Sequence, residues 1–185
     1  MRLVMLGGPG AGKGTQSKKL SLDLKIPVIA TGDVLRKAMT SGSTLGNQAR
    51  EFVEKGELVP DGMMIQFMRD RLLQPDVSNG WILEGYPRTA FQAEELDFLL
   101  DELQQGLNWA IYLQVSDSLM LERSLTRAKV DDQPDIIQRR IEMFHSRTVP
   151  ILEYYQYKQT LLTIQAEVSP EEVEQEICQK LGLST

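Results

Sequence analysis

The residues best suited to chemistry lie near the start of the chain, where residues 7–15 read G-G-P-G-A-G-K-G-T. Glycine lets successive backbone N–H groups turn toward one phosphate, and a helix that begins at the end of such a loop adds its positive end. Lys13 then supplies a mobile point charge, and Thr15 supplies a hydroxyl for phosphate oxygens or a magnesium shell. One feature departs from the general phosphate-loop signature, because Gly14 separates the lysine from the threonine. The segment predicts a phosphate-binding loop.

The flanking sequence supports this interpretation. An apolar run at residues 3–6 predicts a strand before the loop, and residues 16–24 predict a helix after it. A glycine-rich turn without a ligand is therefore disfavoured. Such a loop indicates a nucleotide but not a reaction. The strings D-x-x-G and N-K-x-D, which a GTPase switch would need, do not occur in the chain.

A second set of candidates is rich in arginine and has no obvious general base. Phosphoryl transfer to a phosphate acceptor needs charge neutralisation, alignment and exclusion of water, whereas an alcohol acceptor usually needs a carboxylate. A site with several arginines and no general base therefore favours a monophosphate acceptor. Arg123 and Arg127 lie four residues apart, so they either flank an anion or complement the end of a helix. The candidates are Arg88, Arg123, Arg127, Arg139 and Arg140.

Short apolar runs alternate with longer amphipathic stretches along the chain, which predicts parallel β–α–β units. The expected fold is α/β, with a five-stranded parallel sheet covered by helices on both faces. We expect one domain over residues 1–185. Residues 31–74 show no strand signal and predict a small helical insertion. The predicted strands are residues 3–6, 27–29, 81–83, 110–114 and 161–164.

Two later helices have clear signals. Ser169, Pro170 and Glu172 form the pattern of a capping box with proline in the first turn. Residues 135–157 predict one long helix that Pro150 should kink. This long helix carries residues 137, 141, 144, 148 and 152 at spacings of three and four. In the last helix the buried stripe is predicted at Val173, Ile177 and Leu181.

Composition narrows the setting of the protein. The formal charge of −6 argues against nonspecific binding to nucleic acid or anionic lipid. A single cysteine, Cys178, excludes an intramolecular disulfide and a cysteine-rich zinc site. No apolar run reaches the length of a membrane span, and no signal peptide is expected. We expect a cytoplasmic monomer that binds neither nucleic acid nor a membrane.

Three further segments carry a family resemblance. Residues 31–36 read T-G-D-V-L-R, residues 56–61 read G-E-L-V-P-D, and residues 81–89 read W-I-L-E-G-Y-P-R-T, with Gln92 close behind. Together with the loop at residues 7–15, they resemble the adenylate kinase family in register from Arg2 to about Tyr155. The resemblance implies a P-loop NTPase fold with a nucleoside monophosphate (NMP)-binding insertion at about residues 30–59 and a very short lid at about residues 126–134.

The resemblance also implies an activity, the reversible transfer of the γ-phosphoryl group of Mg·ATP to AMP, giving two ADP. Mg²⁺ is expected as the cofactor that enters with ATP, without zinc. The implied catalytic residues are Lys13, Arg88, Arg123, Arg127 and Arg140. The implied ATP-binding residues are Gly10, Ala11, Gly12, Lys13, Gly14, Thr15, Arg123, Arg127 and Val168.

The implied AMP site selects the acceptor. Relatives that prefer UMP or CMP tend to carry alanine and asparagine in place of Thr31 and Gln92, and the glutamine amide suits the N1/N6 edge of adenine. A UMP/CMP kinase is the nearest alternative, and a nucleotide-binding regulator without turnover is the non-enzyme alternative. The implied AMP-binding residues are Thr31, Arg36, Glu57, Leu58, Val59, Gly85, Tyr86, Pro87, Arg88, Gln92, Lys129 and Arg140.

The chain departs from the family pattern at three places. The lid is shorter than the usual short form, and Lys129 stands where the family has an arginine, with fewer donors and no fork. Glu84 replaces the usual aspartate near the magnesium shell. Val168 stands where a small residue commonly touches the adenine of ATP through its backbone. No chemistry is assigned to His145, for which no partner is expected.

Overall fold

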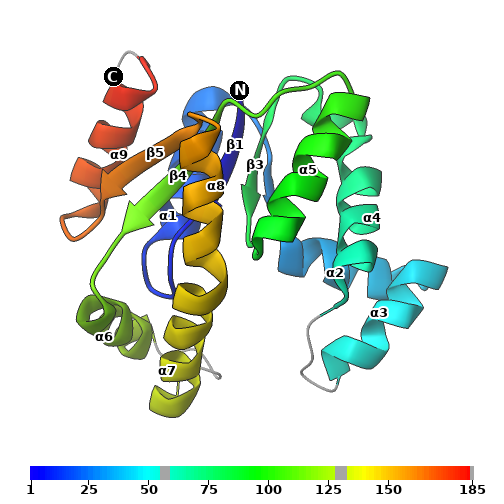
Figure 1. The fold of residues 1–185 in the computed structure, drawn as a ribbon, viewed down its shortest axis with the longest axis horizontal. Coiled ribbons are helices and arrows are strands. Elements are labelled where there is room, and N and C mark those ends of the chain that lie inside the picture. The colour runs from blue at the N-terminus through cyan, green and yellow to red at the C-terminus, as the bar shows by residue number, and fades with distance from the viewer. Residues whose placement is uncertain (55–58, 128–132, 184–185) are drawn as a thin grey trace.

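In the computed structural model the described residues are 1–54, 59–127 and 133–183, and only the backbone of residues 54 and 127 is described. Within them the chain forms a five-stranded parallel sheet in the order β2-β3-β1-β4-β5 (Figure 1). Each predicted strand lies within one residue of an observed one, so the α/β fold is confirmed. The strands are β1 (Arg2–Leu6), β2 (Val28–Ala30), β3 (Trp81–Glu84), β4 (Trp109–Gln114) and β5 (Leu161–Gln165).

The two faces of the sheet carry separate cores because side chains alternate along each strand. Val4 and Leu83 belong to the core covered by α4, α5 and α8. Leu3 and Ile82 belong to the core covered by α1 and α9 on the opposite face. Helices therefore cover both faces, as predicted. The helices are α1 (Lys13–Leu24), α2 (Thr31–Thr40), α3 (Thr44–Glu54), α4 (Asp61–Leu72), α5 (Ala90–Glu102), α6 (Asp117–Arg127), α7 (Pro134–Met143), α8 (Val149–Tyr157) and α9 (Pro170–Lys180).

The stretch between β2 and β3 is helical where it is described, through α2, α3, α4 and a 3₁₀ turn, η1 (Pro75–Val77). Figure 1 shows α2 and α3 beyond one side of the sheet's lower edge, and α6 and α7 beyond the other side. This arrangement leaves the lower edge of the sheet between two helical pairs.

The predicted long helix is divided. A π-helical segment, η2 (Phe144–Thr148), separates α7 from α8, and Pro150 stands in the first turn of α8. A break in α-helical hydrogen bonding ahead of Pro150 is expected because proline lacks the N–H group. Of the residues at spacings of three and four, Thr148 and Leu152 are half-buried, whereas Ile151 and Tyr155 of α8 are fully buried.

The capping box of α9 is confirmed. The Ser169 hydroxyl accepts a hydrogen bond from Glu172 N at 3.3 Å, and the Glu172 carboxylate accepts one from Ser169 N at 3.0 Å. Val173 and Ile177 are buried as predicted, whereas Leu181 is only half-buried, because it stands at the C-cap where α9 ends. No helix in the described part of the chain is both long enough and apolar enough to cross a bilayer.

Candidate active site

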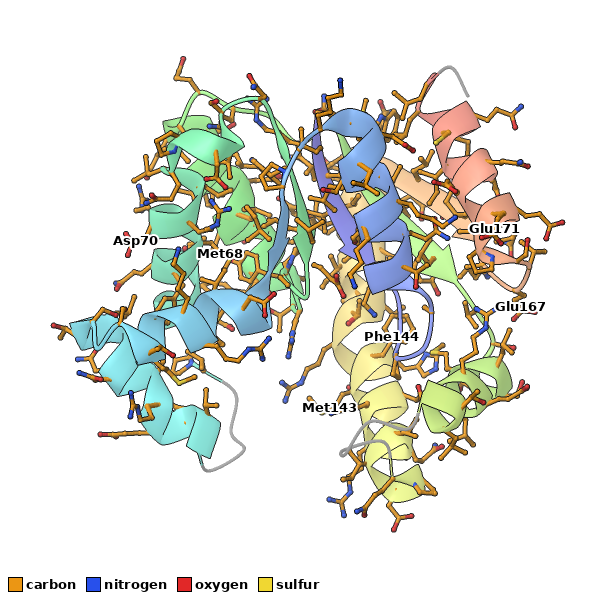
Figure 2. All side chains as sticks on the ribbon, turned by 180° about the vertical axis from the view of Figure 1, so that it is seen from behind. Met68, Asp70, Met143, Phe144, Glu167 and Glu171 are labelled. Carbon is orange, nitrogen blue, oxygen red and sulfur yellow. The ribbon has the colours of Figure 1, made fainter. Side chains whose placement is uncertain are left out.

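The turns after β1, β2 and β3 meet at one edge of the sheet, because these strands are parallel and adjacent. Together with α4, α5, α7 and η2, they line a cavity of about 550 Å³. The predicted site residues on its wall are Lys13, Thr31, Val59, Gly85, Tyr86, Pro87, Arg88, Gln92 and Arg140. Figure 2 shows two further wall residues, Met143 and Phe144, at the junction of α7 and η2. The cavity therefore joins the phosphate loop to the segments predicted for AMP.

The phosphate loop contributes a cation and a helix end. Lys13 Nζ donates hydrogen bonds to Gly7 O and Gly8 O, each at 2.7 Å. Helix α1 begins directly after Gly12, and its first turn contains no acidic residue that would offset the positive helix end. This part of the cavity can accept a phosphate group. The remaining predicted loop residues belong to the same segment without lining the cavity: Gly10, Ala11, Gly12, Gly14 and Thr15.

Close packing against α6 restricts the loop. Gly10 has a φ of +73°, and a Cβ atom there would lie 2.7 Å from Met120 O. Only glycine adopts this conformation without strain at such a distance. The shape of the loop therefore depends on α6 as well as on its own sequence.

The ends of β2 and β3 are joined by a hydrogen bond from Thr31 Oγ1 to Glu84 O, at 3.0 Å. The Glu84 carboxylate faces the start of α1, because its Oε1 lies 3.5 Å from where a Cβ atom on Gly14 would stand. A carboxylate at the start of α1 offers the oxygen chemistry that Mg²⁺ prefers. Among the described residues, no three His, Cys, Asp or Glu side chains form a group that could hold a metal by themselves.

The Gln92 side chain is fixed at both ends of its amide. Its Oε1 accepts a hydrogen bond from Arg88 N at 2.7 Å, and its Nε2 donates one to Asp61 Oδ1 at 2.6 Å. The side chain is only 6% exposed. Tyr86 packs beside it, and burial, followed by the charge of Asp61, raises the pKa of the Tyr86 hydroxyl. This wall presents a held amide to the cavity.

Among the residues that the structure describes, three arginines line the same cavity: Arg88, Arg140 and Arg147. Arg88 Nε donates to Gly85 O at 2.7 Å, which directs its guanidinium. Part of the Arg88 side chain is exposed. Burial of its guanidinium among the surrounding groups lowers the pKa of Arg88, and the like charge of Arg140 lowers this pKa further. Arginine stays protonated in proteins, so these like charges lie close together and repel one another. An anion bound between them would offset that repulsion.

The comparison with known proteins agrees with this geometry. The family model described as adenylate kinase matches residues 5–160. The chain belongs to the adenylate kinase family. An "Adenylate kinase 2" of Nostoc sp. is 59% identical over 181 residues, which cover 98% of each chain. An "Adenylate kinase 2" of Synechocystis sp. is 59% identical over 166 residues, covering 90% of this chain and 92% of the relative. An "Adenylate kinase" of Xanthomonas campestris pv. campestris is 41% identical over 186 residues, covering 98% of this chain and all of the relative.

In this member of the adenylate kinase family, the Arg123 guanidinium contacts the Val168 backbone, and neither residue lines the cavity. Arg123 Nη1 donates to Ala166 O at 2.7 Å, and Nη2 donates to Val168 O at 3.4 Å. The Val168 side chain is 45% exposed. The segment after β5 is thus tied to α6, the helix that also packs on the phosphate loop.

Some predicted residues are not brought to the cavity. Arg36 forms an ion pair with Asp33 and does not line the cavity wall. Arg139 is exposed and also does not line it. Glu57, Leu58, Lys129 and the side chain of Arg127 lie outside the described residues.

The structure also adds residues that the sequence reasoning missed. Asp61 follows Pro60 at the start of α4, and no local pattern connects it to Gln92. Arg147 had a detectable signal, because Arg140, Phe144 and Arg147 follow at intervals of four and three residues and all line the cavity. A partner for His145 was also missed: its Nε2 lies 2.8 Å from Asp117 Oδ1.

Proposed function

We propose that this protein catalyses the reversible transfer of the γ-phosphoryl group from Mg·ATP to AMP, giving two ADP. The observation that carries the proposal is the single cavity in which Lys13 of the phosphate loop faces the same space as Gln92 and the arginines. A donor and an acceptor phosphate bound there would meet directly. Family membership supports the same reaction class.

On the donor side, the loop from Gly10 to Thr15 holds the phosphates of ATP by backbone N–H groups and the end of α1. The Thr15 hydroxyl and the Glu84 carboxylate would hold the water shell of the Mg²⁺ that accompanies ATP, and the ion would neutralise charge on the phosphates. Arg123 and Arg127 bind the phosphate chain, and the backbone at Val168 contacts the donor adenine. The bond between Arg123 and the Ala166 carbonyl supports this placement, because it brings the arginine to the segment after β5.

On the acceptor side, the Gln92 amide binds the adenine edge of AMP, and Thr31 and Gly85 border the nucleotide. Arg88 holds the AMP phosphate, with Arg140 and Arg147 beside it. Arg36, Lys129 and the backbone from Glu57 to Val59 complete the proposed set. The exposed pair of Arg36 with Asp33 is compatible with this role, since an exposed ion pair is weak and an incoming phosphate can replace the carboxylate.

The chemical step needs no general base. A phosphate oxygen of AMP attacks the γ-phosphorus in line, and the bond from that phosphorus to the β–γ bridging oxygen breaks, so that both products are ADP. Lys13, Arg88 and Arg140 neutralise the negative charge that spreads over the transferred group. We further propose that the insertion (residues 30–59) and the lid (residues 126–134) close over the cavity and exclude water. A monomer that acts in the cytoplasm, with Mg²⁺ and without zinc, remains part of this proposal.

The test is ADP formation from Mg·ATP with AMP, UMP, CMP or GMP as acceptor, against a blank without acceptor. Strong preference for AMP is the expected result. Preference for UMP or CMP would overturn the reading of Thr31 and Gln92. Binding of ATP without turnover of any acceptor would overturn the proposed reaction.

A further inference from the structure

The Gln92 amide is held from two separate elements. Asp61 is the first residue of α4, and Arg88 lies in the turn between β3 and α5. Asp61 Oδ1 accepts from Nε2 at 2.6 Å, while Arg88 N donates to Oε1 at 2.7 Å. Asp61, Arg88 and Gln92 all lie on the cavity wall. A buried side chain at the wall is thus fixed by one acceptor and one donor.

These two contacts permit only one orientation of the amide. A 180° flip would set the NH₂ group against the N–H of Arg88 and the carbonyl against the carboxylate of Asp61. Both contacts would then be repulsive. An amide has two N–H donors and two acceptor lone pairs, so the observed contacts leave one donor and one lone pair for a ligand. The free donor and the free acceptor stand in a fixed order.

That fixed order has a chemical counterpart in purines. In a 6-amino purine, N1 accepts and the N6 amino group donates. In a 6-oxo purine, N1–H donates and O6 accepts, so the pattern is reversed. An amide that cannot flip matches one class and leaves unpaired polar groups against the other.

We propose that Asp61 is a positioning residue, which fixes the donor–acceptor order of the Gln92 amide and so selects 6-amino over 6-oxo purine monophosphates as acceptors. The proposal rests on the proposed function, in that Gln92 is taken to contact the acceptor base. Asp61 itself need not touch the nucleotide. Its effect passes through the side chain that it holds.

A purely structural role predicts something different. Asp61 stands in the first turn of α4, where a carboxylate also favours the helix dipole. Loss of that effect alone would lower stability and would change all acceptors in parallel. Glu171 is a matched control, since it is a first-turn carboxylate of α9. In Figure 2, Glu171 lies on the opposite side of the molecule from α4, the helix that carries the labelled Asp70.

The experiment compares Asp61→Asn and Glu171→Gln with the unchanged protein. An asparagine side chain can turn its NH₂ group toward a flipped Gln92, so the repulsion on that side disappears. The readouts are kcat/KM for AMP and for IMP with Mg·ATP, and the Kd values of both monophosphates from calorimetry. We expect Asp61→Asn to lower the AMP-to-IMP ratio about tenfold, as expected for one hydrogen bond, mainly through KM for AMP and with KM for ATP unchanged. Glu171→Gln should leave the ratio unchanged.

Parallel losses for AMP and IMP, with an unchanged ratio, would overturn the positioning role. If Asp61→Asn folds poorly, Asp61→Glu retains the acceptor and should keep more of the selectivity than Asp61→Ala. The Kd values separate this proposal from the proposed function. If no acceptor is turned over but the unchanged protein binds AMP more tightly than IMP, and Asp61→Asn removes that preference, only the proposed reaction is overturned. If the unchanged protein binds AMP and IMP equally, the positioning role is overturned.

Discussion

The two halves of the cavity are built in different ways. The donor half of the wall comes from one continuous segment, residues 7–15, of which Gly7, Gly8, Pro9 and Lys13 line the cavity. Its shape is set by glycine conformation, by the start of α1 and by packing against α6. The acceptor half is assembled from α2, the start of α4, the turn before α5, the first turn of α5, and η2, and its side chains are held by groups of other segments, both backbone and side chain. A local loop tolerates little change in sequence, whereas an assembled wall depends on contacts between distant residues. The first half should therefore determine whether transfer occurs, and the second half should determine the acceptor.

The largest expected effect is on the donor half. Lys13→Met should lower kcat by about a thousandfold or more, because the ammonium group neutralises charge on the transferred phosphoryl group. Lys18→Met, which changes an exposed lysine of the same helix, is the control. Retention of more than a tenth of wild-type kcat would remove Lys13 from the mechanism.

The next effect concerns the arginine at the junction of the two halves. Arg88→Lys should lower kcat/KM for AMP by about a hundredfold, since a lysine cannot keep the Gly85 carbonyl contact and also present a guanidinium fork. Arg69→Lys, at a surface pair with Glu102, should have no comparable effect. Near-normal activity of Arg88→Lys would show that only the charge matters there.

A smaller and selective effect is expected in the acceptor half. Gln92→Asn shortens the amide by one methylene, so it should raise KM for AMP about tenfold and affect CMP less. The measurement is the ratio of kcat/KM for the two acceptors. Equal loss for AMP and CMP would remove Gln92 as the selector and would weaken the contrast between the two halves.

The smallest effect is expected for Arg147, whose side chain is exposed and forms no hydrogen bond or ion pair with the rest of the described chain. Arg147→Ala should lower kcat/KM about two- to fivefold at low salt, and the difference should shrink as ionic strength rises. Arg139→Ala, an exposed arginine of α7 that does not line the cavity, should be unchanged. If both variants behave alike, Arg147 acts only through its contribution to the overall electrostatic potential of the protein and not through its place on the cavity wall.

The same contrast explains what the sequence could predict. The strands, the phosphate loop and the capping box at Ser169 were predicted because each depends on neighbours a few residues apart. The glycine-rich loop predicted a phosphate site without any knowledge of α6, although Gly10 packs against Met120 there.

Contacts between distant residues were not predictable in the same way. Asp61 and Gln92 are 31 residues apart, and Arg123 bonds a carbonyl 43 residues away. Only the folded sheet brings those pairs together. The pairing of Arg36 with Asp33 is different, because a spacing of three residues on a helix predicts such a contact.

The central claim is that both phosphate chains occupy one cavity at the same time, so that the phosphoryl group passes directly between them. Initial rates measured over a matrix of Mg·ATP and AMP concentrations test this claim most directly. Direct transfer predicts double-reciprocal lines that intersect, because both nucleotides must be bound before reaction. Parallel lines, the pattern of a covalent phosphoryl-enzyme intermediate, would contradict it.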